Sequence, residues 1–207
     1  MATADGNRLI LCGTAAGAPA FSHAAHGTAF FCVPLIVPRR SGTAARLPVI
    51  VPERRLPPGL MEGGRLRVQG QLRAYRWFDE AGRHLRLFAY AKEAALAAPD
   101  DGAQNEVQLS GTVCRPPVYR VTPLGREIAD VLLCCEQPFG RRDFLPVILW
   151  SALARSAAAW PAGQRVRLAG RRRGAPHRLR GVRRVRVRAE LSLCRQQHPP
   201  HGRVRAR

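Results

Sequence analysis

The sequence contains almost no lysine, little acid and few aromatic residues. Lys92 is its only lysine, so nearly all of the 34 basic residues among its 207 are arginine. They outnumber the 14 acidic residues and give a formal net charge of +20, while aromatic residues make up 6% of the chain. This excess of positive charge favours a polyanionic partner, with nucleic acid ahead of an acidic membrane surface.

Long apolar runs are also absent. No run approaches the ~18 residues that a membrane-spanning helix needs, so we expect no membrane span. The segment Met1–Asn7 is not a basic stretch followed by an apolar one, and we expect no signal peptide. Hydrophobic residues nevertheless make up 46% of the chain, which is typical of a protein that buries a core and excludes a wholly disordered one.

Motifs for metal binding and catalysis are missing as well. No two of the six cysteines are spaced C-x-x-C, and no His pair completes a zinc site. The histidines do not form H-E-x-x-H, and there is no Gly-x-x-x-x-Gly-Lys phosphate loop. Cys134 and Cys135 lie in an apolar run, where thiols behave as small hydrophobic groups. We therefore expect no enzyme activity, no metal, no cofactor and reduced cysteines.

An internal repeat organises what is present. The segment Asn7–Thr14, N-R-L-I-L-C-G-T, matches Asn105–Thr112, N-E-V-Q-L-S-G-T, at an offset of 98 residues. Leu47–Ile50 and Leu145–Ile148 are both L-P-V-I at the same offset. The repeat predicts two copies of one domain. The predicted organisation is a first domain at 1–98, a linker at 99–104, a second domain at 105–195 and a basic flexible tail at 196–207.

The two copies differ in charge. Residues 1–104 contain 13 basic and 8 acidic residues, a net charge of +5, whereas residues 105–207 contain 21 and 6, a net charge of +15. If both domains bind a polyanion, the second is expected to contribute more of the electrostatic affinity.

Each copy is predicted to consist mainly of short strands. Apolar and polar residues alternate with period two near the start of each copy and again about 55 residues later, as half-buried strands require. The clearest helix is Ser151–Trp160, and its counterpart Glu53–Met61 contains Pro57-Pro58-Gly59 and is predicted to be only a turn. Five strands with a helix between the third and fourth predict an all-β chain of two tandem OB-fold barrels.

The second copy resembles the bacterial single-stranded DNA-binding protein family from Asn105 to about Arg173. The resemblance includes N-E-V-Q-L-S-G-T-V, P-x-x-R-x-T-P-L-G, I-A-D-V-L-L, F-L-P-V-I-L-W-S-A-L-A and A-G-Q-R-V-R-L-A-G-R, in that order. In the first copy, Val68–Gly82 is similar to the family's fourth strand and the hairpin that follows it. The whole chain resembles a fused tandem form of the family.

The resemblance implies a set of nucleic-acid contacts. Aromatic rings on an exposed sheet stack on unpaired bases, while arginines neutralise the phosphates between them. The positions where the family has stacking rings are occupied here by Phe139, Phe144, Trp150 and Trp77. The arginines that flank these rings, or lie in the following hairpin, are the candidate phosphate contacts: Arg120, Arg126, Arg141, Arg142, Arg171, Arg172, Arg73 and Arg76.

Structural roles compete with these functional ones. Trp150 follows three apolar residues and fits a core position, and Phe144 and Trp77 are compatible with packing or with binding. An arginine-rich proteome would also place arginine on ordinary solvated faces. Trp160, which ends the predicted helix, matches no stacking position and is predicted to lie in the core or an interface.

The leading hypothesis is a sequence-nonspecific single-stranded DNA-binding protein that acts in DNA replication, repair or recombination. An RNA-binding OB-fold module and a primosome-like protein–protein adaptor are the alternatives. The resemblance implies a homodimer with four OB folds, in a cytoplasmic, nucleoid-associated bacterial protein. The family usually ends in an acidic tail that recruits repair enzymes, whereas this chain ends in a basic one, so recruitment by that route is not expected.

Overall fold

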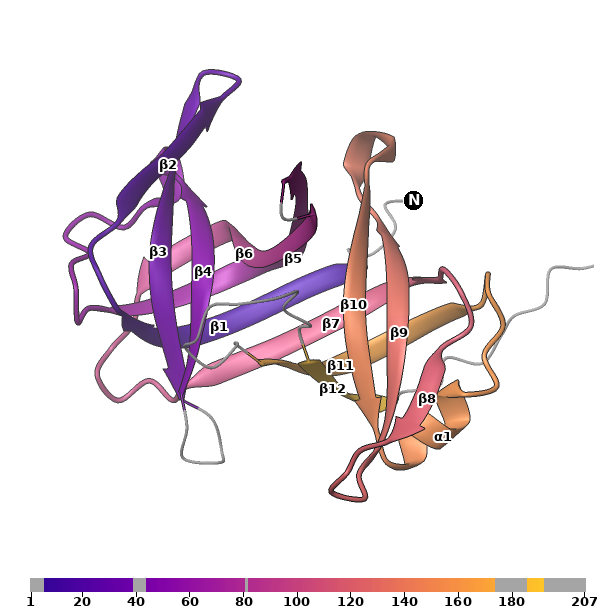
Figure 1. The fold of residues 1–207 in the computed structure, drawn as a ribbon. Helices are drawn as coiled ribbons and strands as arrows, with labels where there is room; N and C mark the ends of the chain where they lie inside the picture. Colours follow the sequence, from indigo (N-terminus) through magenta and orange to yellow (C-terminus); the bar gives the residue numbers. More distant parts are fainter. Residues whose placement is uncertain (1–5, 39–43, 81, 174–185, 192–207) are drawn as a thin grey trace, which may run out of the picture.

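The computed structural model describes residues 6–38, 44–80, 82–173 and 186–191. It contains two β-barrels side by side (Figure 1). The predicted basic tail at 196–207 lies outside the described residues. Within them, no helix is long and apolar enough to cross a membrane, and no three His, Cys, Asp or Glu side chains are grouped as metal ligands.

The first barrel carries an extra strand, β2, which precedes the second strand of the OB pattern. A 3₁₀ turn, η1, stands where the prolines predicted a turn in place of a helix. The strands and turn are β1 (Asn7–Ala15), β2 (Ala20–Ala25), β3 (Thr28–Pro38), β4 (Ala44–Pro52), η1 (Glu53–Arg55), β5 (Arg65–Asp79) and β6 (Gly82–Leu96).

The second barrel repeats this order, with β8 as its extra strand. The helix predicted at 151–160 is present but shorter, because it ends at Ala157. Trp160, which lies beyond its end, is buried as predicted. The elements are β7 (Gln104–Val113), β8 (Val118–Val121), β9 (Glu127–Glu136), η2 (Pro138–Gly140), β10 (Arg142–Trp150), α1 (Ala152–Ala157), β11 (Arg165–Arg173) and β12 (Arg186–Leu191).

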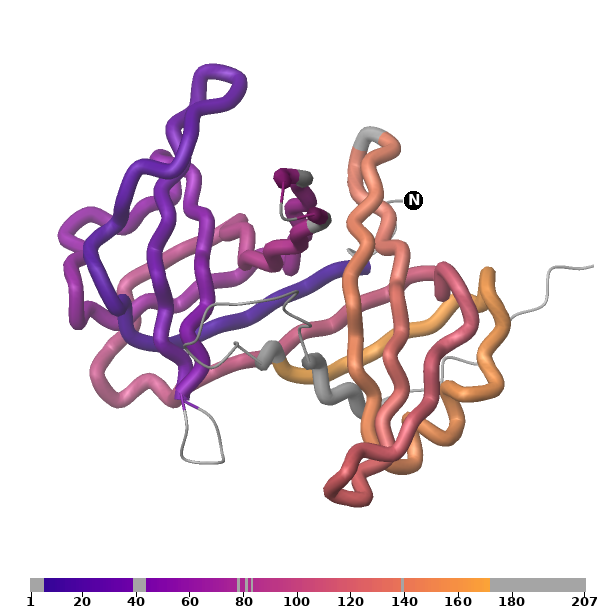
Figure 2. The backbone as a smooth tube through the Cα atoms, viewed as in Figure 1, coloured from indigo at the N-terminus to yellow at the C-terminus, as the bar shows by residue number. Residues whose placement is uncertain are grey.

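The two barrels are joined through their first strands. β1 and β7 pair antiparallel, with Leu9 opposite Val107, so one sheet runs from one barrel into the other (Figure 2). On its other edge β1 pairs with β5 of its own barrel. Parallel pairing of Val49 in β4 with Ala89 in β6 closes the first barrel. The sequence predicted two OB folds, which the structure confirms, but it did not predict the seam between them.

The core follows the strand alternation. Leu9, Leu11, Val107 and Leu109 are all at most 1% exposed and belong to one apolar cluster that includes residues of both barrels. Burial of this kind contributes roughly 25 cal/mol per Å² of apolar surface removed from water. A substantial part of the folding free energy is therefore shared across the β1–β7 seam.

The cysteines in the described part of the chain are free thiols. Cys135 is buried, and burial is the main cause that raises its pKa to about 12, with the negative charge of Asp143 as a second cause. At neutral pH it is an uncharged thiol that packs as a small apolar side chain, as its sequence context predicted.

Candidate nucleic-acid interface

The β2–β3, β5–β6 and β9–β10 hairpins project from the same side of the molecule, toward the top of Figure 1. Tight turns end the first and third. His26 and Gly27 have φ values of 49° and 71° in the β2–β3 turn, and Gly140 has a φ of 70° in the β9–β10 turn.

A groove of about 690 Å³ lies in the first domain between the β2–β3 arm and the base of the β5–β6 hairpin. Phe21 and Tyr75, which line it, are 65% and 60% exposed, unusually high values for large rings. Two exposed rings that line one groove form a joint apolar surface, which makes this groove a candidate binding site. The full lining is Phe21, Ser22, His23, Cys32, Pro48, Ile50, Tyr75, Arg86 and Phe88.

Neighbouring rings hold the β2–β3 arm in shape. Phe21 meets Phe31 edge to face with ring centroids 6.2 Å apart. On the same arm His23 stacks on Phe30 at 4.7 Å. Aromatic pairs of this kind contribute about 0.5–1.5 kcal/mol beyond the area they bury. These ring contacts therefore support the β2–β3 arm from which Phe21 projects.

A second row of rings lies along the β5–β6 hairpin. Tyr75 and Trp77 have nearly parallel rings 5.9 Å apart, and Trp77 stacks on His84 of the opposite strand at 4.8 Å. The Trp77 Nε1 group donates a hydrogen bond to Asp79 Oδ2 at 3.3 Å. Trp77 was predicted as a stacking residue, and the structure places it half-buried in this row, beside the exposed ring of Tyr75.

Three of the rings that line the groove were not predicted from the sequence: Phe21, Tyr75 and Phe88. Two of them carried a usable sequence signal. Phe21 lies in a run of small and polar residues, A-P-A-F-S-H-A-A, which offers it no apolar neighbours along the strand. Tyr75 is two residues before Trp77, and residues two apart on a strand share a face of the sheet.

In the second domain the outer face of β10 carries two of the predicted rings. Leu145, Val147 and Leu149 point into the core, so the alternate residues lie on the outer face of the barrel. Phe144 and Trp150, both half-buried, lie at the two ends of that face, about 20 Å apart by strand geometry.

A smaller groove, of about 290 Å³, occupies the same part of the barrel between these rings. Pro146 and Ile148, the outer-face residues between Phe144 and Trp150, line it. Arg115, Arg120 and Asp130 also line it. Asp130 pairs with Arg120, so Arg115 supplies the unmatched positive charge among these three residues.

Most of the predicted phosphate contacts are exposed. Arg126, Arg141, Arg142 and Arg171 all have exposed side chains. Arg120 is half-buried and its Nε lies 3.1 Å from Asp130 Oδ2, so part of its charge is already matched. The side chains of Phe139 and Arg172 lie outside what the structure describes, although their backbones belong to η2 and β11.

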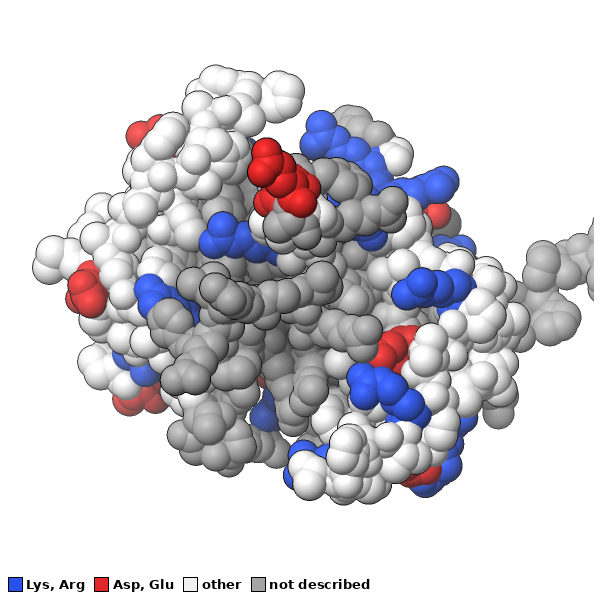
Figure 3. Space-filling view, in the orientation of Figure 1, with Lys and Arg blue, Asp and Glu red and all other residues white. Residues whose placement is uncertain are grey.

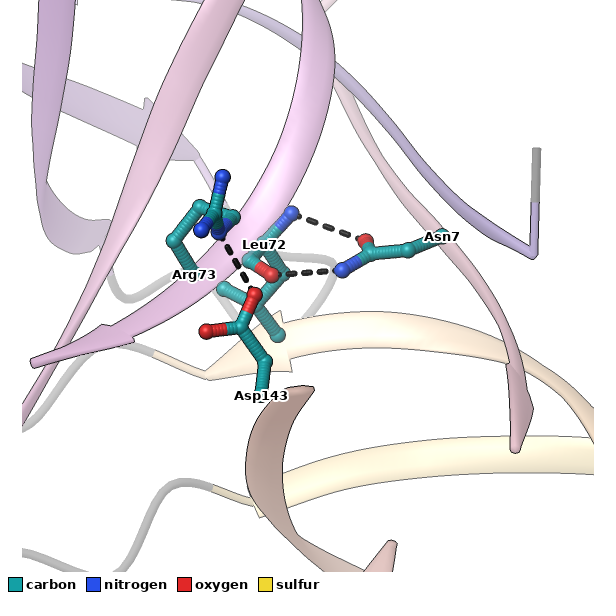
Figure 4. Close-up of polar contacts among 4 residues, drawn as sticks. All are labelled: Asn7, Leu72, Arg73 and Asp143. Atoms are coloured by element: carbon teal, nitrogen blue, oxygen red, sulfur yellow. Dashed lines mark hydrogen bonds and ion pairs between the residues drawn. The ribbon is translucent and has the colours of Figure 1, made fainter. Parts of the chain in front are cut away.

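The other two predicted phosphate contacts, Arg73 and Arg76, lie where the two domains meet. Arg73 of β5 forms an ion pair with Asp143 of β10, with Nε and Oδ2 2.5 Å apart (Figure 4). The guanidinium carbon of Arg76 lies 4.7 Å from the ring centroid of Phe144. The hairpin of the first domain is therefore docked on the second domain, close to one of its predicted stacking rings.

Charge is unevenly distributed on this face. Figure 3 shows basic side chains over the second domain and near the junction, and acidic ones gathered at the tip of the β5–β6 hairpin. Asp79 and Glu80 are the exposed acids at that tip. A polyanion is expected to follow the flanks of the hairpin and to avoid its tip, since like charges repel.

No protein-family model and no curated protein matches this chain. Among solved structures, a deletion mutant of the single-stranded DNA-binding protein from Thermus aquaticus matches with a TM-score of 0.75 and 23% identity. That match covers 95% of this chain and 98% of the other. The wild-type Thermus aquaticus protein matches with a TM-score of 0.70 and 24% identity, over 97% of this chain and 96% of the other.

This chain has the fold of the Thermus protein. The matches extend over nearly the full length of both chains, so the shared fold includes the placement of the two OB domains as well as each barrel. At 23% and 24% identity, the similarity to the Thermus protein concerns the backbone fold. Any role of an individual side chain has to be argued from its own position in this structure.

Proposed function

We propose that this chain binds single-stranded DNA without sequence preference, in DNA replication, repair or recombination. The observation that carries the proposal is the presence, in both OB domains, of a groove lined or flanked by accessible rings and arginines. The tandem fold shared with the Thermus single-stranded DNA-binding protein supports the same assignment.

The mechanism follows from the two kinds of side chain. Exposed arginines attract the phosphates over distances of about a Debye length, ~8–10 Å at physiological salt. Bases then stack on rings, at about 1–3 kcal/mol each and without regard to their identity. Phe21, Tyr75 and Trp77 would serve the first domain, and Phe144 and Trp150, with Phe139 as predicted from the sequence, the second.

The test is a titration with oligo-dT at several salt concentrations. If about six phosphates are neutralised, a fourfold increase in salt should weaken binding about 300-fold, because the logarithmic slope for single strands is roughly −0.7 per phosphate. Intrinsic fluorescence should fall on binding, since Trp77 and Trp150 lie at the proposed surface. Equal affinity for duplex and single-stranded DNA would contradict the proposal, and competition by RNA oligomers would show whether DNA is preferred.

We also propose that two chains associate, which would bring four OB domains together. Exposed apolar side chains at and just beyond β8, which include Val121 and Leu124 at 56% and 80% exposure, offer a surface for such an association. Light scattering of the full chain with bound DNA is expected to give twice the chain mass of 22.8 kDa plus the mass of the bound DNA. A strictly monomeric mass would exclude the dimer.

A further inference from the structure

The β5–β6 hairpin leaves its own barrel at a defined residue. β1 and β5 pair as far as Leu9 opposite Gly70. Beyond that pair, the side chain of Asn7 forms the hydrogen bonds to β5 that the backbone of β1 no longer forms. Its Nδ2 donates to the Leu72 carbonyl at 2.6 Å, and its Oδ1 accepts from the Leu72 N–H at 2.9 Å (Figure 4). Asn7 is 1% exposed, so both bonds are shielded from water. They fix the direction in which the hairpin departs.

An ion pair then fixes the hairpin to the second domain. Arg73, the residue after Leu72, pairs with Asp143, whose side chain is only 7% exposed. A buried carboxylate that loses its partner is strongly unfavourable, so this contact resists separation. Arg73 itself is 25% exposed and lies at the edge of the buried region.

Three residues farther along the hairpin, Arg76 lies over Phe144. The 4.7 Å separation is that of a cation–π contact. The positive charge of Arg76 also acts on Cys114, beside the end of β7, although burial is the larger effect and raises the pKa of that thiol. Arg76 is nevertheless exposed, so part of its guanidinium remains accessible.

We propose that Arg76, in cation–π contact with Phe144 and positioned by the Arg73–Asp143 ion pair, is a base-stacking platform at the junction of the two domains. A planar guanidinium has two faces, and bases stack on guanidinium planes as they do on aromatic rings. The Arg76 guanidinium lies over Phe144, and its exposed part would receive the base. A single strand leaving the row of Tyr75 and Trp77 then continues over Arg76 onto the second domain. This inference rests on the proposed function.

Two other roles for Arg76 make different predictions. If it only neutralises a phosphate, its charge matters and its shape does not, and lysine would replace it. If the docked hairpin is instead a lid that covers Phe144, removal of the guanidinium would expose the ring and strengthen binding.

The deciding experiment compares Arg76→Lys and Arg76→Ala with the wild-type full chain, using labelled oligo-dT at several salt concentrations. Both variants are expected to weaken binding by between about 5- and 150-fold, the value of one lost stacking contact. Arg76→Lys should keep the wild-type salt slope, because it keeps the charge. Arg54→Lys, at an exposed arginine of η1 that lines neither groove, is the matched control and should bind as the wild type does.

Wild-type affinity in Arg76→Lys would overturn the stacking role of Arg76 and show that it is a phosphate contact. Tighter binding by Arg76→Ala would also overturn the stacking role and show that the hairpin is a lid over Phe144. In either case the wild-type protein still binds oligo-dT, so the proposed function stands. A wild-type protein that fails to bind oligo-dT would overturn both.

A second comparison tests the ion pair as a positioning device. Asp143→Asn removes the carboxylate that holds Arg73, and Glu127→Gln makes the same change of charge at an ion pair with Arg155 that does not touch the hairpin. The readout is the ratio of the Kd for an oligo-dT of about 8 nucleotides, which fits one OB domain, to the Kd for one of about 24. Asp143→Asn should lower this ratio about tenfold, because the path between domains loses its fixed geometry, while Glu127→Gln should not. An unchanged ratio in Asp143→Asn would overturn the positioning role.

Discussion

Replacing Gly70 by alanine is expected to lower the free energy of unfolding by about 3 kcal/mol, near the upper end for an overpacked site. An added Cβ would lie 1.9 Å from the Tyr90 carbonyl oxygen, far inside van der Waals contact. That oxygen belongs to the backbone of β6, so it cannot move aside as a flexible side chain would. The pairing of β5 with β6 also shifts register at Gly70, and the alanine methyl group would force these strands apart at that bulge.

Urea unfolding followed by circular dichroism would measure this effect as a lower midpoint. Gly102→Ala is the matched control, since a Cβ at Gly102 would meet nothing within 4 Å. That variant should be neutral or slightly stabilising, because alanine restricts the unfolded chain more than glycine does. Equal midpoints for the two variants would show that the β5–β6 bulge relaxes far more readily than its geometry indicates.

Replacing Phe21 and Tyr75 together by alanine is expected to weaken oligo-dT binding at least about 30-fold, or about 2 kcal/mol. The two rings line one groove and are both largely exposed, so each is available to stack on a base. Stacking contributes about 1–3 kcal/mol per base, and the lower bound is the sum of two contacts at the low end of that range. Neither ring belongs to the apolar core, so the expected loss of stability is limited to the Phe21–Phe31 and Tyr75–Trp77 ring pairs, at about 0.5–1.5 kcal/mol each.

Fluorescence anisotropy of labelled oligo-dT would measure the loss. Met61→Ala, which removes another exposed large side chain at 70% exposure but lies outside the groove, is the control and should bind normally. If the double variant kept wild-type affinity while Trp150→Ala lost it, DNA would be held by the second domain alone.

The repeat and the strand alternation were sufficient to predict the OB folds. Glycines at the same place in the two copies show why. A Cβ on Gly13 would lie 2.3 Å from the Ile36 carbonyl oxygen, and one on Gly111 would lie 2.6 Å from that of Cys134. Both are positions where the first strand of a barrel approaches the backbone of β3 or β9 too closely for a side chain, so only glycine fits. Such requirements recur at a fixed offset and can be recognised without coordinates.

The binding surface was less accessible to sequence reasoning. Trp77, Phe144 and Trp150 were candidates because the resemblance pointed to their positions, and whether each stacks on a base stays a prediction. Phe21 and Tyr75 were missed because their importance comes from exposure, which depends on how two distant hairpins frame one groove. Arg73 and Arg76 were predicted as phosphate contacts, but their partners Asp143 and Phe144 lie about 70 residues away in the other copy.

The sequence by itself determined two barrels, their strands, their basic character and the turn or helix in each, because these depend on local patterning and on the identity of single residues. Only the tertiary structure decided that β1 pairs with β7 and that the hairpin of one barrel rests on the other. Pairing between strands about 100 residues apart leaves no periodic trace in either strand. It arises because the backbone N–H and C=O groups at the edges of β1 and β7 satisfy each other while the apolar side chains beside them are buried in one core, and neither effect can be read from one strand alone.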